Sequence, residues 1–262
     1  MGTRFTREML TRPPRAGIDA VTTLRHFAIV TYAVEPERVR AHLHPRFMPD
    51  VVTTDGERAL VSVVPFHDIE FRLARCPWPR FRFGQTNYRT YVIDKETGER
   101  CVWFFGTCLD SWSVAIPRLA WKLPWHKGRI RFDCARSHED QRYEHYRMTT
   151  ASDWAPAMVE LEDTGNPPGP LPGFANRETA EVILTHPLRG VFSRRDGRLG
   201  SYSVWHDRLQ PSEGRCIDAR FELLDRLKLV PLAEQTRTHS VLIQHETEFT
   251  IFLPPRGLSG AH

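Results

Sequence analysis

Short runs rich in β-branched and aromatic residues alternate along the chain with turn signals, a pattern typical of an antiparallel β protein. The first four runs are HFAIVTYAV from His26, ALVSVVPF from Ala59, TNYRTYVID from Thr86 and CVWFFGTCL from Cys101. Eight more follow: RIRFDCA, RYEHYRM, AMVELED, GVFSRR, LGSYSVWH, IDARFELL, HSVLIQHE and EFTIFLP. The pattern predicts a mainly β protein of the α+β kind, built from antiparallel sheets with a few short helices.

The residues between neighbouring runs predict two hairpins. Gly98, within KETGER, supplies a turn between the third and fourth runs. Asp196 and Gly197 separate GVFSRR from LGSYSVWH and are the strongest hairpin signal in the sequence.

Three short helices are predicted, over residues 35–43, 111–121 and 176–184. Asn176 is a suitable N-cap for the last of them. Pro117 is expected to bend or restart the second.

One domain is expected, over residues 23–256. The chain has 262 residues, of which 40% are hydrophobic, enough to bury one sizeable core. Residues 1–22 are expected to form a loosely ordered arm, and residues 257–262 a tail. The proline- and glycine-rich segment 163–173 is predicted to be a loop.

The charge pattern argues against a nucleic-acid partner. The formal net charge is +4, from 36 basic and 32 acidic residues, and the excess is spread along the chain. Only the segment TRFTREMLTRPPR concentrates it, and this segment is either a solvated arm or, less in keeping with its prolines, a phosphate-binding one. No apolar run approaches the roughly 20 residues of a membrane helix, so no membrane partner and a cytoplasmic location are expected.

The sequence predicts no cofactor and no metal. Neither G-x-x-x-x-G-K-[ST] nor G-x-G-x-x-G occurs, which argues against nucleotide-dependent chemistry. The five cysteines form an odd number without a C-x-x-C pair, and the 12 histidines include no H-E-x-x-H.

Strand TNYRTYV carries the most informative polar residues. Alternation places Asn87, Arg89 and Tyr91 on one face of the strand. If that face is the inner one, Arg89 suits a carboxylate-bearing ligand, because its planar fork binds carboxylates in bidentate fashion. The alternative is a structural ion pair between Arg89 and an acid such as Asp110 or Glu70.

Asp110 is a second candidate. It follows the apolar run CVWFFGTCL, where a strand gives way to a helix and site residues are common. The alternative is that its side chain only caps the helix.

Taken together, TNYRTYV, VWFFGTCLDSW, KLPWHKG, LTHPLRGVFSRRDGRLGSYSVWHD and HSVLIQHETEFTIFLPP resemble the DUF2071 (YqjF-like) family. The resemblance covers roughly residues 25–255, and the family looks like a branch of the acetoacetate decarboxylase-like superfamily. It implies an antiparallel β fold, cone- or barrel-like, around a hydrophobic central pocket.

The decarboxylases of that superfamily use a lysine that forms a Schiff base with a β-keto acid, in a Lys-Lys pair soon after a proline. In LPWHKG, Trp125 and His126 occupy the corresponding positions and Lys127 follows one step late, while Lys122 precedes the proline. Gln85 stands where relatives commonly have a glutamate. The decarboxylase mechanism is therefore not transferable residue by residue.

The resemblance leads to two hypotheses for function. In the first, the protein binds a small organic acid, for example a keto acid, and is a lyase or decarboxylase with a non-standard site. The catalytic candidates are Lys127, His126 and Asp110, and the ligand-binding candidates are Arg89, Asn87, Tyr91, Gln85, Trp125, Phe104 and Phe105. In the second, the same pocket serves a non-catalytic binding or sensing protein. A homo-oligomer is plausible on general grounds.

Overall fold

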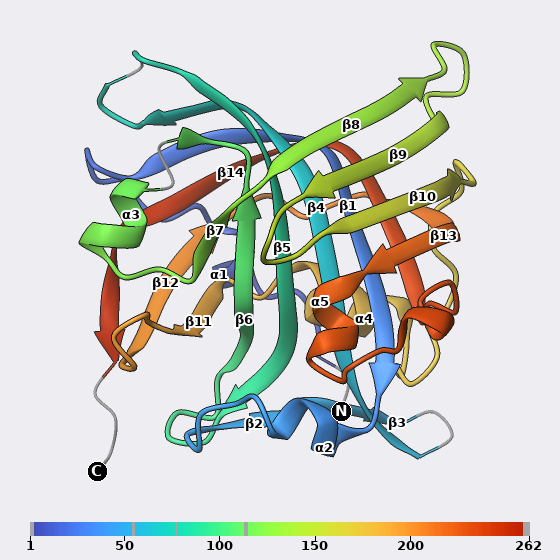
Figure 1. Ribbon diagram of the computed structural model, residues 1–262, viewed down its shortest axis with the longest axis horizontal. Helices are drawn as coiled ribbons and strands as arrows, with labels where there is room; N and C mark the ends of the chain where they lie inside the picture. The colour runs from blue at the N-terminus through green and yellow to red at the C-terminus, as the bar shows by residue number, and fades with distance from the viewer. Residues whose placement is uncertain (1–2, 54–55, 77, 113–114, 259–262) are drawn as a thin grey trace.

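The structure, a computed structural model, describes residues 3–53, 56–76, 78–112 and 115–258. Within these residues, seven strands close into a barrel (Figure 1). In order around the barrel they are β1 (Ala20–Val34), β4 (Glu57–Leu73), β5 (Phe81–Asp94), β6 (Arg100–Leu109), β11 (Arg189–Ser193), β12 (Leu199–Trp205) and β14 (Ser240–Leu258). β1 pairs with β14 to close the ring, and all neighbours are antiparallel except β6 with β11.

A second group of strands extends from the start of β14 and forms a wing beside the barrel. It consists of β13 (Ser212–Phe221), β10 (Ala157–Asp163), β9 (Tyr143–Ala151) and β8 (Arg129–Arg136). Three short strands pair with barrel strands: β2 (Phe47–Pro49) with β5, β3 (Val51–Thr53) with β4, and β7 (Trp125–Lys127) with β6. The predicted mainly β, barrel-like fold is confirmed.

The helices are short and lie between strands. They are α1 (Arg7–Leu10), α2 (Pro36–Arg40), α3 (Ala115–Ala120), α4 (Arg177–Thr185), α5 (Glu222–Arg226) and a 3-10 turn over Leu232–Glu234. Asn176 caps α4 as predicted, since its side chain accepts a hydrogen bond from the Thr179 amide at 2.8 Å. None of the helices in the described part of the chain has the length and apolar character needed to span a bilayer.

Both predicted hairpins are present. β5 and β6 pair across the turn that contains Gly98, whose φ is +72°, and β11 and β12 pair across Gly197, whose φ is +81°. Backbone at these angles favours glycine, because an L side chain would be strained there.

Some predicted boundaries are wrong. HSVLIQHE and EFTIFLP form one strand, β14, because no turn residue separates them. The run IDARFELL ends as a strand at Phe221 and continues as α5. The helix predicted over 111–121 is described as α3, and residues 113–114 of that prediction lie outside the described residues.

The N-terminal segment packs on the barrel more closely than its sequence indicates. Its backbone carbonyl at Met9 accepts hydrogen bonds from Trp205 and pairs with His186, each at 3.2 Å. Arg12 lies over the Trp205 ring at 4.3 Å, and Arg15 contacts Glu248 at 2.7 Å. These contacts fix the segment against the outside of β12 and β14.

The two largest parts of the core lie on opposite sides of the barrel strands, because successive side chains of a strand point to opposite faces. One part lines the barrel interior and includes Leu24, Phe66 and Phe104. The other lies between the barrel and the wing and includes Tyr88, Tyr146 and Phe221. One face of β5 therefore points into the barrel, and its other face is buried under the wing.

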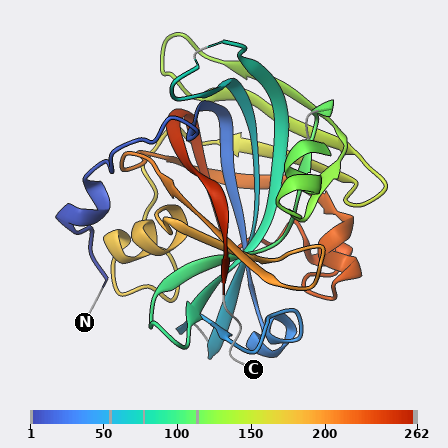
Figure 2. The ribbon, with the colours of Figure 1, turned by 90° about the vertical axis from the view of Figure 1, so that its left-hand side faces the viewer.

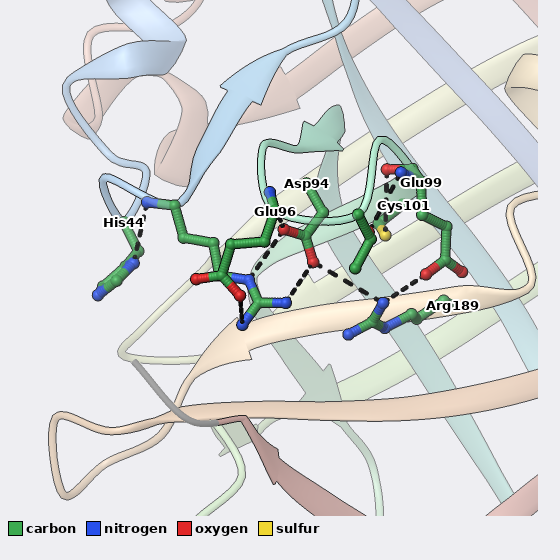
Figure 3. Close-up of polar contacts among 8 residues, drawn as sticks. His44, Asp94, Glu96, Glu99, Cys101 and Arg189 are labelled. Atoms are coloured by element: carbon green, nitrogen blue, oxygen red, sulfur yellow. Dashed lines mark hydrogen bonds and ion pairs between the residues drawn. The ribbon is translucent and has the colours of Figure 1, made fainter. Parts of the chain in front are cut away.

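A buried ion-pair network joins the strands at one end of the barrel (Figure 3). Asp94, at the end of β5, is fully buried and accepts two hydrogen bonds from Arg46, at 2.9 and 2.7 Å. Arg189, the first residue of β11, lies 3.8 Å from Asp94 and also pairs with Glu99. Burial raises the pKa of Asp94, but the Arg46 hydrogen bonds and the charges of both arginines outweigh it and hold that pKa below its ordinary value.

Replacing Asp94 with alanine leaves Arg46, whose side chain is 9% exposed, without its buried partner. We expect the free energy of unfolding to fall by on the order of 3 kcal/mol near neutral pH, measured by urea denaturation. Because the pKa of Asp94 is lowered in the folded state, this contribution is present above the unfolded pKa of about 4 and is lost as pH falls through the folded pKa.

The matched control is Glu96→Ala. Glu96 also pairs with Arg46, at 2.8 Å, but its side chain is 43% exposed, so we expect a loss under about 1 kcal/mol. Equal losses for the two variants would show that burial of the Asp94 pair does not matter.

Candidate functional site

The barrel encloses a cavity of about 420 Å³. Its walls come from the inward-facing residues of all seven barrel strands, together with segments that follow β4, β6, α4 and β12. Most of these side chains are apolar, including Leu24, Phe66, Phe83, Leu109 and Phe249. The size lies within the range of pockets that hold small organic ligands.

Strand β5 sends a line of polar side chains into the cavity. Gln85, Asn87 and Arg89 all line it, while Tyr88 between them packs under the wing. The predicted alternation is therefore confirmed for these residues, and the structure shows that the face with Asn87 and Arg89 is the inner one.

Arg89 lacks a carboxylate partner among the described residues. Its Nη2 donates to the Leu184 carbonyl at 2.9 Å, its guanidinium lies 5.6 Å from the centre of the Tyr91 ring, and its Nε has no hydrogen-bond partner. The acids named as structural alternatives are engaged elsewhere: Glu70 pairs with Arg72 and Arg80, and Asp110 accepts a bond from the Ile130 amide. The predicted alternative of a structural ion pair is wrong.

A short hydrogen-bond chain holds the two amides next to Arg89. Asn87 Oδ1 accepts from Gln85 Nε2 and from Thr107 Oγ1, both at 2.9 Å. Asn87 Nδ2 and Gln85 Oε1 have no partner among the described residues, so one donor and one acceptor remain for a ligand.

Asp68 is a cavity residue that the sequence analysis missed. It lies on β4, is 2% exposed and accepts a hydrogen bond from Thr22 Oγ1 at 2.8 Å through Oδ1, while Oδ2 has no partner among the described residues. Burial raises the pKa of Asp68 to about 7, and the Thr22 hydrogen bond opposes that rise. The available signal was alternation, because Asp68 is in phase with the buried residues Val64 and Phe66.

His206 adds a neutral imidazole to the wall. It is 1% exposed, stacks on Phe249 at 4.3 Å and lies 4.6 Å from the ring of His186. Burial, with a smaller effect from His186, lowers the pKa of His206 to about 3. The ring is therefore uncharged at neutral pH and does not compete with Arg89 for an anion.

Two of the predicted aromatic residues, Trp125 and Phe104, line the cavity. Phe105 does not, because it follows Phe104 on the same strand and faces the core under the wing. Tyr91 faces inward, yet its hydroxyl is taken up by Ser62 Oγ at 2.8 Å and the Leu184 carbonyl at 3.2 Å, so it lies outside the cavity wall.

The three catalytic candidates also lie outside the cavity wall. His126 alternates with Trp125 on β7 and stacks on Trp154 at 3.9 Å; burial, and then the charge of Arg226, lower its pKa to about 4. Lys127 is exposed, as is Asp110. The cavity wall formed by the described residues contains no lysine, and these residues include no cluster of three side chains suited to a metal ion. A role for Lys127, His126 or Asp110 elsewhere stays a prediction.

Several solved structures share this fold. MppR, an enduracididine biosynthesis enzyme solved in complex with pyruvate, is 15% identical, with a TM-score of 0.59 over 97% of this chain and 93% of its own. An acetoacetate decarboxylase from Legionella pneumophila is 14% identical, with a TM-score of 0.58 over 96% and 94% of the two chains. An acetoacetate decarboxylase-like enzyme from Sphingomonas wittichii is 10% identical, with a TM-score of 0.58 over 94% and 95%. At these identities the likeness establishes the fold alone.

No curated protein matches the sequence. The family model DUF2071, described as an uncharacterized conserved protein, matches residues 21–247, which is most of the chain. The chain therefore belongs to the DUF2071 family and has the acetoacetate decarboxylase-like fold.

Proposed function

We propose that the barrel cavity binds an organic acid with an apolar body, and that Arg89 pairs with its carboxylate. The observation that carries the proposal is a cavity-lining guanidinium with no carboxylate partner among the described residues. A cation removed from water is costly unless it is paired, so an unpaired one in a cavity favours an anionic ligand. The planar guanidinium matches a carboxylate in particular.

The surroundings of Arg89 support an acid with a substantial apolar part. Asn87 and Gln85 provide one free donor and one free acceptor near the carboxylate, and the rest of the wall is mainly aromatic and aliphatic. A cavity of about 420 Å³ is large for a keto acid of three or four carbons. MppR, which has the same fold, was solved with pyruvate bound. This supports a carboxylic acid as the class of ligand, but pyruvate is smaller than the ligand that this cavity could hold.

Imine chemistry has little support in this cavity. A Schiff base needs an amine within reach of the carbonyl carbon. The wall contains no lysine among the described residues, and Lys127 is exposed and is not among the residues that line the cavity. We therefore favour binding without an amine intermediate.

Asp68 favours a second candidate function, proton transfer to or from the bound acid. A carboxyl group with a pKa of about 7 exchanges protons readily at neutral pH, which suits a general acid or base. Its unpartnered Oδ2 and its place in the cavity wall are consistent with this role. In this form the protein would be a lyase or isomerase acting on a keto acid without a Schiff base.

Replacement of Arg89 by glutamine tests the binding proposal. We expect octanoate and phenylpyruvate to bind wild-type protein and to bind Arg89→Gln at least about ten-fold more weakly, because a charge-assisted hydrogen bond is lost. Titration calorimetry measures both affinities. Arg129→Gln, at an exposed position on β8, is the control and should bind as wild type. Unchanged affinity in Arg89→Gln would refute the assignment of Arg89.

Borohydride trapping tests the absence of amine chemistry. We expect the intact mass of the protein to stay unchanged after treatment with borohydride and acetoacetate or pyruvate, because no lysine reaches the cavity. A ligand-dependent mass increase that disappears in Lys127→Ala would instead establish a Schiff base at Lys127.

Asp68→Asn tests the proton-transfer candidate. We expect wild-type protein to speed deuterium exchange at the methyl group of pyruvate in D2O, followed by NMR, with a rate that rises through about pH 7 as Asp68 ionises. The asparagine variant should lose this exchange. Exchange that is equal in both proteins, or absent in wild type, excludes Asp68 as the base for this substrate.

The stability of the same variant checks the pKa independently. The folded pKa of Asp68 is raised, so the unfolded state binds fewer protons between about pH 4 and pH 7 and wild type loses stability across this window, by on the order of 4 kcal/mol. Asp68→Asn should lack this loss, whereas Asp153→Asn, at an exposed position, should retain it.

A further inference from the structure

Large apolar side chains are exposed where the cavity opens to the surface. Trp78, in the connection between β4 and β5, is 78% exposed, and Trp112, after β6, is 74% exposed. Leu73 at the end of β4 is 42% exposed, and all three side chains also line the cavity. We call Leu73, Trp78 and Trp112 the mouth surface.

The mouth surface lies on one side of the molecule. Figures 1 and 2 place the β4–β5 connection and α3, which follows Trp112, on the side that faces the viewer in Figure 2. Exposed apolar residues that occur singly need no explanation, but two tryptophans that continue the wall of an apolar cavity mark a contact surface.

The β4–β5 connection beside the mouth surface is positively charged. Residues 69–82 contain four arginines and one acid, Glu70, an excess of three positive charges (4 − 1). Glu70 pairs with Arg72 and Arg80, at 3.7 and 2.7 Å. Arg75 and Arg82, both exposed, have no carboxylate partner among the described residues. A negatively charged partner surface is therefore favoured here.

We propose that the mouth surface docks on an anionic lipid bilayer. Tryptophan rings, apolar with one polar N–H, are enriched at the level of lipid headgroups, and nearby arginines gain from anionic lipid. No spanning helix is needed for such contact. Docking would bring the cavity opening to the boundary where apolar acids reside, so a ligand could enter without crossing water.

The docking proposal depends on the residues of the mouth surface. Only the entry of an acid from the bilayer into the cavity rests on the proposed function. The two can therefore fail separately. Arg89→Gln should lose acid binding and still bind vesicles, since Arg89 lies inside the barrel.

Sedimentation with vesicles tests the docking. We expect wild-type protein to bind vesicles containing about 30 mol % phosphatidylglycerol, to bind pure phosphatidylcholine much more weakly, and to be released at about 0.5 M NaCl. The double variant Trp78→Ser, Trp112→Ser should bind at least about ten-fold more weakly. Arg75→Glu with Arg82→Glu should lose at least about five-fold per residue.

The control is Ile217→Ser. Ile217 is 53% exposed on β13 in the wing, away from the cavity wall, so the Ile217→Ser variant should bind vesicles as wild type does. Thermal unfolding of each variant confirms that it is folded. Three results would overturn the proposal: no binding by wild type, equal binding to both lipid compositions, or wild-type binding by the tryptophan variant. A change of oligomeric state in the tryptophan variant, with vesicle binding intact, would assign the mouth surface to a second copy of the chain.

Discussion

Closure of the barrel by the pairing of β1 with β14 is the constraint on which the rest of the structure depends. A closed ring has no free edge, and it forces every second side chain of each strand into a shared interior. The strands that close it come from opposite ends of the chain, Ala20–Val34 and Ser240–Leu258, so neither half can form the cavity alone. The position of each cavity residue then follows from its register on a barrel strand.

Three charged or titratable groups on β4 and β5, the buried Asp94 and Asp68 and the half-buried Arg89, have different partners. Asp94 is paired with Arg46, and its charge is stabilised. Asp68 lies among apolar residues with one hydrogen bond and is largely neutral below about pH 7. Among the described residues, Arg89 has a carbonyl and an aromatic ring as partners and no carboxylate. The Asp94–Arg46 pair joins the strands at the end of the barrel. Asp68 and Arg89 instead give the cavity wall a carboxyl group and a guanidinium group that lack a charged partner among the described residues.

Local periodicity was enough to predict the parts of this structure that depend on one strand. The shared face of Asn87 and Arg89, the hairpin at Gly197 and the N-cap at Asn176 all follow from short-range rules, although alternation alone does not say which face of β5 is the inner one. The cavity could not be outlined this way, because its wall is assembled from strands far apart in the chain. Phe104 and Phe105, as neighbours on a strand, could not both have faced it.

His126, Lys127 and Asp68 were the hardest residues to place from the sequence. His126 and Lys127 sit on a three-residue strand whose orientation is set by its pairing with β6, which no local pattern reveals. Asp68 was overlooked because a single acid in an apolar strand resembles a surface residue unless its phase is compared with its neighbours.

Arg89 contacts the carbonyl end of a helix through Leu184. Leu184 lies in the last turn of α4, and the carbonyl end of a helix carries about half an elementary negative charge. The partial negative charge at the end of the helix offsets part of the positive charge of Arg89, but it is smaller than one full charge. An acid that supplies the remaining charge binds the folded state alone, so the folded population rises with the concentration of that acid. Under the proposed function, the acid would therefore stabilise the folded protein, and the amount of folded protein would follow the supply of that acid.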